Sequence, residues 1–439
     1  MVQFSSAARG LGSYRSREGC FMALDSFRRF AGRLLPRPKG PESIWRSPVV
    51  LDRGPLGEAC VALDGRGHGA ALWENGGALW IMPVGPHCAA ASARLPLGEG
   101  STPQILLNAE GQGVALWRTG APGALCLYGQ VVGAGRGPAH LLVSTEGSIR
   151  HLQAAVDRRG NALVIWLQER EGLLEVMALT YDIRAGAWDQ EPTCLARPST
   201  PTVEPRIAVN HREHAMVLWE TDDGADEGLV ASHYWSSEGI WSDRPVPVVN
   251  QSTHAHRVAM DDEGNALAIW IHAPYGQRSS IQASHYDGGR CEWSKAETLC
   301  TAHTLTQTRL VMSGSGQALA AWCQAEERGA TRLVSKGFGG GCWEPGVECL
   351  DLGHEPVREF ALDLGADGQA GVLTVHRSAE GDWVSARLRR QGWSPSVRLV
   401  PPSARVCSAP LLKLCPQGAS ALWTQGVGLD RALVLAETW

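Results

Sequence analysis

The chain has 439 residues and a globular composition, with 44% hydrophobic and 19% charged residues. Its net charge of −5 is uneven: residues 1–40 carry eight basic and two acidic side chains, a balance of +6, which leaves −11 on residues 41–439. An acidic body excludes nucleic-acid binding by the folded part, since phosphate contacts need clustered Lys and Arg. A membrane-spanning helix is excluded because the chain has no run of eighteen apolar residues.

Residues 1–42 form a basic leader with no repeat. From Phe21 to Leu34, apolar residues recur at helical spacing between three arginines, and Pro36 ends the pattern. This predicts a short amphipathic helix over residues 21–35, which could lie on an anionic membrane surface or dock a partner. The alternative is a disordered leader.

The rest of the chain, residues 43–439, is built on one recurring pattern. It reads Gly-Asn-Ala-Leu-Ala-Ile-Trp at 264–270 and returns with substitutions in seven other places, so that the eight copies end at 73, 117, 166, 219, 270, 322, 374 and 423. These end positions are 44 to 53 residues apart. Self-similarity at such a period is the signature of a repeat architecture, so we predict eight units.

Each unit has the grammar of four strands. A short apolar strand leads to a turn of the form Asp-x-x-Gly, as at 157–160 and 261–264, and then to the apolar strand that ends in Trp. Asp starts such turns well because its side chain bonds the backbone two residues on, and Gly supplies positive φ. A more polar strand follows, and a second Trp opens a fourth strand, as at Trp241 and Trp293. Four strands in one unit make a propeller blade.

The two ends of the chain predict a closed ring. The last unit has three strands before the chain stops, and the missing strand is at the other end, where residues 43–51 around Trp45 match the form of residues 241–246. An N-terminal strand that completes the last blade would leave no open seam. We therefore predict an all-β, eight-bladed β-propeller of four-stranded blades over residues 43–439.

The third-to-fourth-strand turn at residues 181–188, from Tyr181 to Trp188, resembles the tryptophan-docking motif of eight-bladed quinoprotein-type propellers. That resemblance implies that the Trp of one blade packs against its neighbour. The chain lacks the adjacent Cys pair and export signal of quinoprotein dehydrogenases, the Asp boxes of sialidases and the Gly-His and Trp-Asp pattern of WD40 repeats. It resembles these proteins in architecture and matches no family with a known activity.

The tryptophans are mostly assigned to this scaffold. Of 17, seven end the second strand and six open the fourth. Their abundance is therefore poor evidence for an aromatic ligand site.

A polar column on the first strands is the better candidate site. Four residues before the turn stand Gln104, Gln153, Arg206, Arg257 and Arg309. First strands line a propeller's tunnel, so these side chains could form a partial ring of donors for an anion, a carboxylate or a glycan. The alternative is that each one bonds the carbonyls of a neighbouring blade and holds the ring together.

Other site chemistry is sparse. His254 and His256 stand two apart on one strand and could face the same side as metal ligands do, but no further ligand is identifiable. No catalytic motif, phosphate loop or dinucleotide fingerprint is present, so we predict no cofactor.

These patterns favour a non-enzymatic scaffold that presents loops and a tunnel to a protein or glycan partner. The alternatives are a carbohydrate-active enzyme with its site at the tunnel mouth and a peripheral membrane protein held by residues 21–35. We expect a monomer. Twelve cysteines without a Cys-x-x-Cys pair or an export signal favour free thiols and a cytoplasmic location.

Overall fold

The structure is a computed structural model, and it describes residues 44–86, 94–121, 124–133, 137–197, 204–222, 227–235, 239–327, 329, 331–350, 355–365, 367–390, 392–400, 410–427 and 430–438. Within these ranges every regular element is a β-strand, and no helix could span a membrane. The predicted helix at residues 21–35 lies outside the described residues. The nine cysteines inside them form no disulfide bond.

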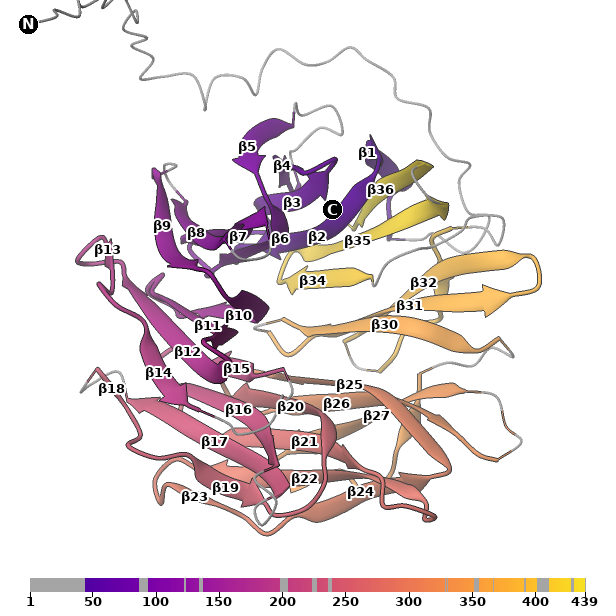
Figure 1. The fold of residues 1–439 in the computed structure, drawn as a ribbon. Coiled ribbons are helices and arrows are strands. Elements are labelled where there is room, and N and C mark those ends of the chain that lie inside the picture. The colour runs from indigo at the N-terminus through magenta and orange to yellow at the C-terminus, as the bar shows by residue number, and fades with distance from the viewer. Residues whose placement is uncertain are drawn as a thin grey trace, which may run out of the picture.

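Eight antiparallel sheets surround a central axis (Figure 1). In each blade the strands are given from the innermost outwards, and in blades 3 to 6 the last two short strands both pair with the third strand. The first four blades contain β2 (Leu56–Leu63), β3 (Gly69–Asn75), β4 (Ala78–Val84) and β5 (Leu95–Glu99); β6 (Ser101–Leu107), β7 (Gly113–Ala121), β8 (Ala124–Val132) and β9 (Ala139–Thr145); β10 (Ser148–Val156), β11 (Ala162–Arg170), β12 (Leu173–Asp182), β13 (Ala187–Trp188) and β14 (Thr193–Ala196); and β15 (Arg206–Val209), β16 (Ala215–Asp222), β17 (Glu227–Trp235), β18 (Ile240–Trp241) and β19 (Val246–Val249). The last four contain β20 (His254–Met260), β21 (Ala266–His272), β22 (Ser279–Asp287), β23 (Glu292–Trp293) and β24 (Glu297–Ala302); β25 (Thr304–Met312), β26 (Ala318–Ala325), β27 (Arg332–Gly339), β28 (Cys342–Trp343) and β29 (Glu348–Cys349); β30 (Val357–Leu364), β31 (Ala370–Ser378), β32 (Gly381–Arg389) and β33 (Val397–Arg398); and β34 (Leu411–Cys415), β35 (Gly418–Val427), β36 (Asp430–Glu437) and β1 (Val49–Gly54).

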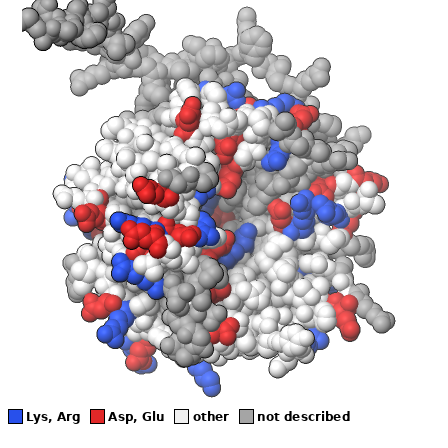
Figure 2. Space-filling view, viewed as in Figure 1, with Lys and Arg blue, Asp and Glu red and all other residues white. Residues whose placement is uncertain are grey.

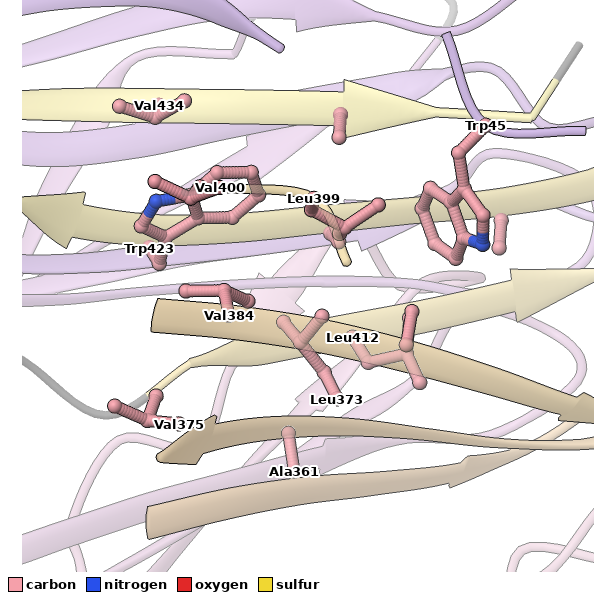
Figure 3. Packing of buried hydrophobic residues seen from close by; sticks show 14 of the residues in the cluster. Trp45, Ala361, Leu373, Val375, Val384, Leu399, Val400, Leu412, Trp423 and Val434 are labelled. Atoms are coloured by element: carbon pink, nitrogen blue, oxygen red, sulfur yellow. The ribbon is translucent and has the colours of Figure 1, made fainter. Parts of the chain in front are cut away.

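The ring closes as the sequence predicts. β1 pairs with β36 in the sheet order β1-β36-β35-β34, so the N-terminal strand is the outer strand of the eighth blade. The first strands of successive blades contact one another all the way around, including β34 against β2. Trp45, just before β1, is buried together with Trp423 in the hydrophobic core between the seventh and eighth blades (Figure 3). The eight-bladed β-propeller is therefore confirmed.

The Asp-x-x-Gly turns owe their shape to one carboxylate. In blade 3, Asp157 Oδ1 accepts hydrogen bonds from the backbone N–H groups of Arg159, Gly160 and Asn161 at 2.8–2.9 Å, and Gly160 has a φ of +96°. Asn variants add a bond between blades: Asn108 Nδ2 donates to the carbonyl of Arg158 in the next turn at 2.8 Å. The repeated turn thus shapes each blade and, in the Asn variants, also fastens it to its neighbour.

Both rows of tryptophan serve packing. Six second-strand tryptophans are among the largest fully buried side chains, and in three blades the indole N–H donates to a Gln two residues on, at 3.1–3.4 Å: Trp166 to Gln168, Trp322 to Gln324 and Trp423 to Gln425. In four consecutive blades the fourth-strand Trp packs on the aromatic residue of the third strand, with ring centroids 5.1–5.3 Å apart: Trp188 on Tyr181, Trp241 on Tyr234, Trp293 on Tyr286 and Trp343 on Phe338.

Candidate functional site

The predicted polar column lies on the inner wall of the ring, on β6, β10, β15, β20 and β25. In four of these strands a β-bulge precedes the column residue, and the residue two positions before it has a φ of +48° to +55°: Thr102, His151, Ala255 and Gln307. A bulge inserts an extra residue and re-aims the side chains around it. The inner wall therefore has one repeated irregularity next to each candidate residue of these four blades.

The two glutamines and the three arginines of the column differ. Gln104 Nε2 donates to the carbonyl of Leu152 in the next blade, so this residue does join two blades. Gln153 stands at the equivalent position of β10 and its side chain makes no hydrogen bond to a described residue. Arg257 Nη1 donates to the carbonyl of His256 at 2.6 Å, and Arg309 Nη1 donates to the carbonyl of Thr308 at 3.0 Å. These two carbonyls belong to the arginine's own strand.

The positive charges of the three arginines repel one another. Burial lowers the pKa of Arg257 to about 9, with further lowering by the positive charges of Arg206 and Arg309. Burial also lowers the pKa of Arg309, and the charge of Arg206, two blades away, adds to that effect. Guanidinium groups keep their protons in proteins, so this cost is relieved by a counter-anion and not by deprotonation.

Three carboxylates lie near this column, just before β15, on the second strand β16 and on the first strand β30, and each already has a partner. Glu204 forms an ion pair with Arg206 and approaches His151 Nδ1 of the preceding blade at 3.4 Å. The carboxylate of Glu220 contacts Nδ1 of the buried His256 at 3.0 Å. The third, Glu359, lies 3.7 Å from Arg358. Among the described residues, neither Arg257 nor Arg309 forms an ion pair with a carboxylate, although Arg309 has its Cζ 5.6 Å from the centre of the Phe360 ring.

In Figure 2, basic and acidic side chains lie together around the hollow at the centre of the ring. The planar, positively charged guanidinium groups of these three arginines lie on adjacent blades and can bind an oxyanion through paired N–H donors. The neighbouring carboxylates limit how much negative charge that oxyanion can bring.

The histidine pair His254 and His256 is separated by the bulge at Ala255, where φ is +54°. His254 is exposed, whereas His256 is only 1% exposed and points at Glu220 on the neighbouring blade. No group of three or more His, Cys, Asp or Glu side chains is arranged to hold a metal ion in the described part of the chain.

Sequence reasoning missed Glu204 and Glu220. Glu204 precedes its arginine by two residues, and Glu220 directly follows the second-strand Trp219, a position that carries an acid in just one other blade, at Glu74. The sequence did contain one signal: a charged residue stands inside an otherwise apolar pattern. Because a buried charge requires a partner, such a residue predicts an ion pair or a charged hydrogen bond.

No protein-family model matches the chain, and no curated protein matches it. Among solved structures it is similar to the WD40 domain of SCAP from fission yeast at 10% identity, covering 90% of this chain and 98% of that one with a TM-score of 0.46. It is also similar to an ulvan lyase, a polysaccharide lyase, at 10% identity, 73% and 89% coverage and a TM-score of 0.47. A sialidase of Trypanosoma rangeli matches at 11% identity, 69% and 56% coverage and a TM-score of 0.39. Likeness at this level concerns the fold alone and assigns no activity.

Proposed function

We propose that this propeller is a binding scaffold whose centre takes up a carboxylate group of a protein or glycan partner at Arg206, Arg257 and Arg309. The observation that carries the proposal is that Arg257 and Arg309 are partly buried, are both repelled by Arg206 and form no ion pair with a carboxylate among the described residues. The more distant Glu204, and for Arg309 also Glu359, offset only part of this repulsion. A buried charge without a partner is costly, so a ligand anion supplies stabilisation that the apo protein lacks.

A carboxylate fits better than a phosphate dianion. Glu204 and Glu220 both raise the pKa of Arg206 against the lowering effect of burial, so both add negative charge beside the site. A second negative charge on the ligand would be repelled by these carboxylates, whereas a monoanion would be accepted by the two remaining guanidinium groups.

The test uses sodium glucuronate as the acidic probe, glucose as its neutral counterpart and inorganic phosphate as the dianion. We expect glucuronate to raise the Tm of the full chain more than glucose or phosphate does at about pH 8, where inorganic phosphate is mainly the dianion, because a ligand that binds only the native state stabilises it by mass action. Arg309→Met should abolish the shift, and Arg290→Met, which changes an exposed arginine on an outer turn, should preserve it. Equal shifts with glucuronate and glucose, or a full shift in Arg309→Met, would refute the proposal.

A second candidate, a carbohydrate-active enzyme, is favoured by one feature: two carboxylates, Glu204 and Glu220, flank a single arginine on the inner wall. Paired carboxylates supply the acid and base of glycoside hydrolysis. Release of reducing ends from uronic-acid-containing glycans by the wild type, lost in Glu204→Gln and in Glu220→Gln, would select this candidate over simple binding.

A further inference from the structure

A repeated contact on the Asp-x-x-Gly turn face of the ring joins the third strands of neighbouring blades. In each case the residue before the third-strand aromatic residue meets the aromatic residue of the next blade. His233 Nδ1 lies 3.2 Å from the hydroxyl of Tyr286, and the ring of His285 packs on Phe338 with centroids 5.9 Å apart. A histidine at this position therefore fills the space between blades 4 and 5 and between blades 5 and 6.

Between blades 3 and 4 the same position holds the smaller Thr180, whose side chain forms a hydrogen bond with Tyr234. Here a cavity of about 260 Å³ opens, lined by Tyr181, Tyr234, Asp182, Glu213 and Arg159, among others. We call it the Tyr181–Tyr234 cleft. It exists because a threonine does not fill the volume that histidine fills one and two blades further on.

The cleft has the chemistry of a cation site. Tyr181 lines it and is only 5% exposed. After burial, the carboxylates of Asp189 and Glu213 raise the pKa of Tyr234, so negative charge surrounds its hydroxyl. Two arginines, Arg159 and Arg184, also line the cleft. Arg159 is already paired with Glu213 across the blade boundary. Aromatic faces together with carboxylates favour ammonium groups.

We propose that the Tyr181–Tyr234 cleft binds the ammonium group of a lysine side chain presented by a partner protein. The cavity volume accommodates an extended lysine side chain. The balance of −11 on residues 41–439 attracts a basic partner segment to this body in the first place. This site is independent of the carboxylate site at the centre of the ring.

The equivalent cleft between blades 6 and 7 provides an internal contrast. It is also open, at about 370 Å³, because Gly337 stands where Thr180 stands in blade 3. In this cleft Arg389 occupies the position of Tyr234, and Arg390 lies beside it. The two clefts differ in the balance of charge. Three carboxylates and two guanidinium groups line the cleft between blades 3 and 4, whereas one carboxylate, that of Glu344, and two guanidinium groups line the cleft between blades 6 and 7. A lysine side chain should therefore bind between blades 3 and 4 and not between blades 6 and 7.

The experiment titrates the full-length chain with a short capped peptide of alternating lysine and serine, and with the same peptide carrying glutamine for lysine. Binding is followed by isothermal titration calorimetry. Thr180→His inserts the residue that the next two blades carry at the equivalent position. Tyr234→Arg copies the cleft between blades 6 and 7, and Thr180→Ser keeps the cleft open as the matched control.

We expect the lysine peptide to bind the wild type and Thr180→Ser with affinities within twofold of each other. Thr180→His and Tyr234→Arg should each weaken binding at least tenfold, and the glutamine peptide should not bind. Equal binding to Thr180→His and the wild type would overturn the proposal, as would no binding to the wild type. Arg309→Met should leave lysine binding unchanged, so failure of the carboxylate site and failure of this cleft can be told apart.

Discussion

Replacing Arg257 by methionine separates the two roles that the arginines of the inner wall can have. If the role of Arg257 is structural, the change removes its hydrogen bond to the carbonyl of His256 on the same strand and destabilises the protein. If they form a site for an anion, the change removes a repelled buried charge and stabilises the protein when no anion is bound. The two roles therefore predict opposite signs.

The magnitude follows from the pKa of Arg257, which burial and then the charges of Arg206 and Arg309 lower to about 9. This is about 3.5 pH units below the ordinary value of 12.5, which corresponds to an upper limit of roughly 5 kcal/mol. Solvent screening at a partly exposed site reduces this to about 2–3 kcal/mol. Because a base with a lowered pKa destabilises the native state in its charged form, this cost is fully present at pH 7.

Loss of the hydrogen bond to His256 costs about 1 kcal/mol, so Arg257→Met should stabilise the anion-free protein by a net ~1–2 kcal/mol. For a chain of this size we expect a rise in Tm of about 1–3 °C by calorimetry in a low-salt, non-coordinating buffer. The exposed Arg290→Met should change the free energy of unfolding by less than about 0.5 kcal/mol. A fall in Tm of more than 2 °C for Arg257→Met would refute the repulsion argument and support a purely structural role.

Three further predictions concern the scaffold. Burial, and then the charge of His214, lowers the pKa of His233 to about 4, so the free energy of unfolding should fall by up to ~3 kcal/mol between pH 6.5 and pH 4. In urea unfolding, His233→Gln should depend less on pH than the wild type does, and an unchanged pH profile would contradict this. Trp45→Ala leaves a cavity at the ring closure and should cost about 3–5 kcal/mol in calorimetry; a cost below 1 kcal/mol would mean that β1 is dispensable for closure. Gln168→Met leaves the buried N–H of Trp166 without its acceptor and should cost about 1–3 kcal/mol in guanidinium unfolding; no loss would show that the bond is energetically neutral.

The fold could be predicted from the sequence because its determinants are local and repeated. The Asp-x-x-Gly turn fixes the first hairpin of each blade wherever it occurs, and the apolar run that follows can only be buried. The ring closure was equally accessible, since the segment around Trp45 has the form of a fourth strand and the last blade lacks one. Local chemistry and global topology agree at these positions, which is typical of a sequence that specifies one structure.

The details of the inner wall could not be predicted in the same way. The bulge positions are occupied by Thr102, His151, Ala255 and Gln307, four residue types with no shared preference for positive φ. The sequence spacing of His254 and His256 indicated one shared face, but the bulge gives the two side chains different surroundings. Backbone irregularities of this kind depend on packing against the next blade, which is information that a single strand does not carry.

The clefts between blades depend on an even smaller signal. Thr180 and Gly337 differ from His233 and His285 at one position of a repeat that otherwise looks alike. Only when the structure shows that this position faces the next blade does the difference in side-chain volume become a difference in cavities.

The pairing of β1 with β36 also has a consequence for how the chain can be rewired. The backbone N–H of Arg46 donates to the carbonyl of Glu437 at 2.7 Å, so the two ends of the propeller lie side by side within one sheet. A short linker between them would allow new termini to be placed at any junction between blades, with every strand pair retained. Such circular permutants would move the chain termini away from the eighth blade. Their folding kinetics would show whether the ring begins to fold at a particular blade.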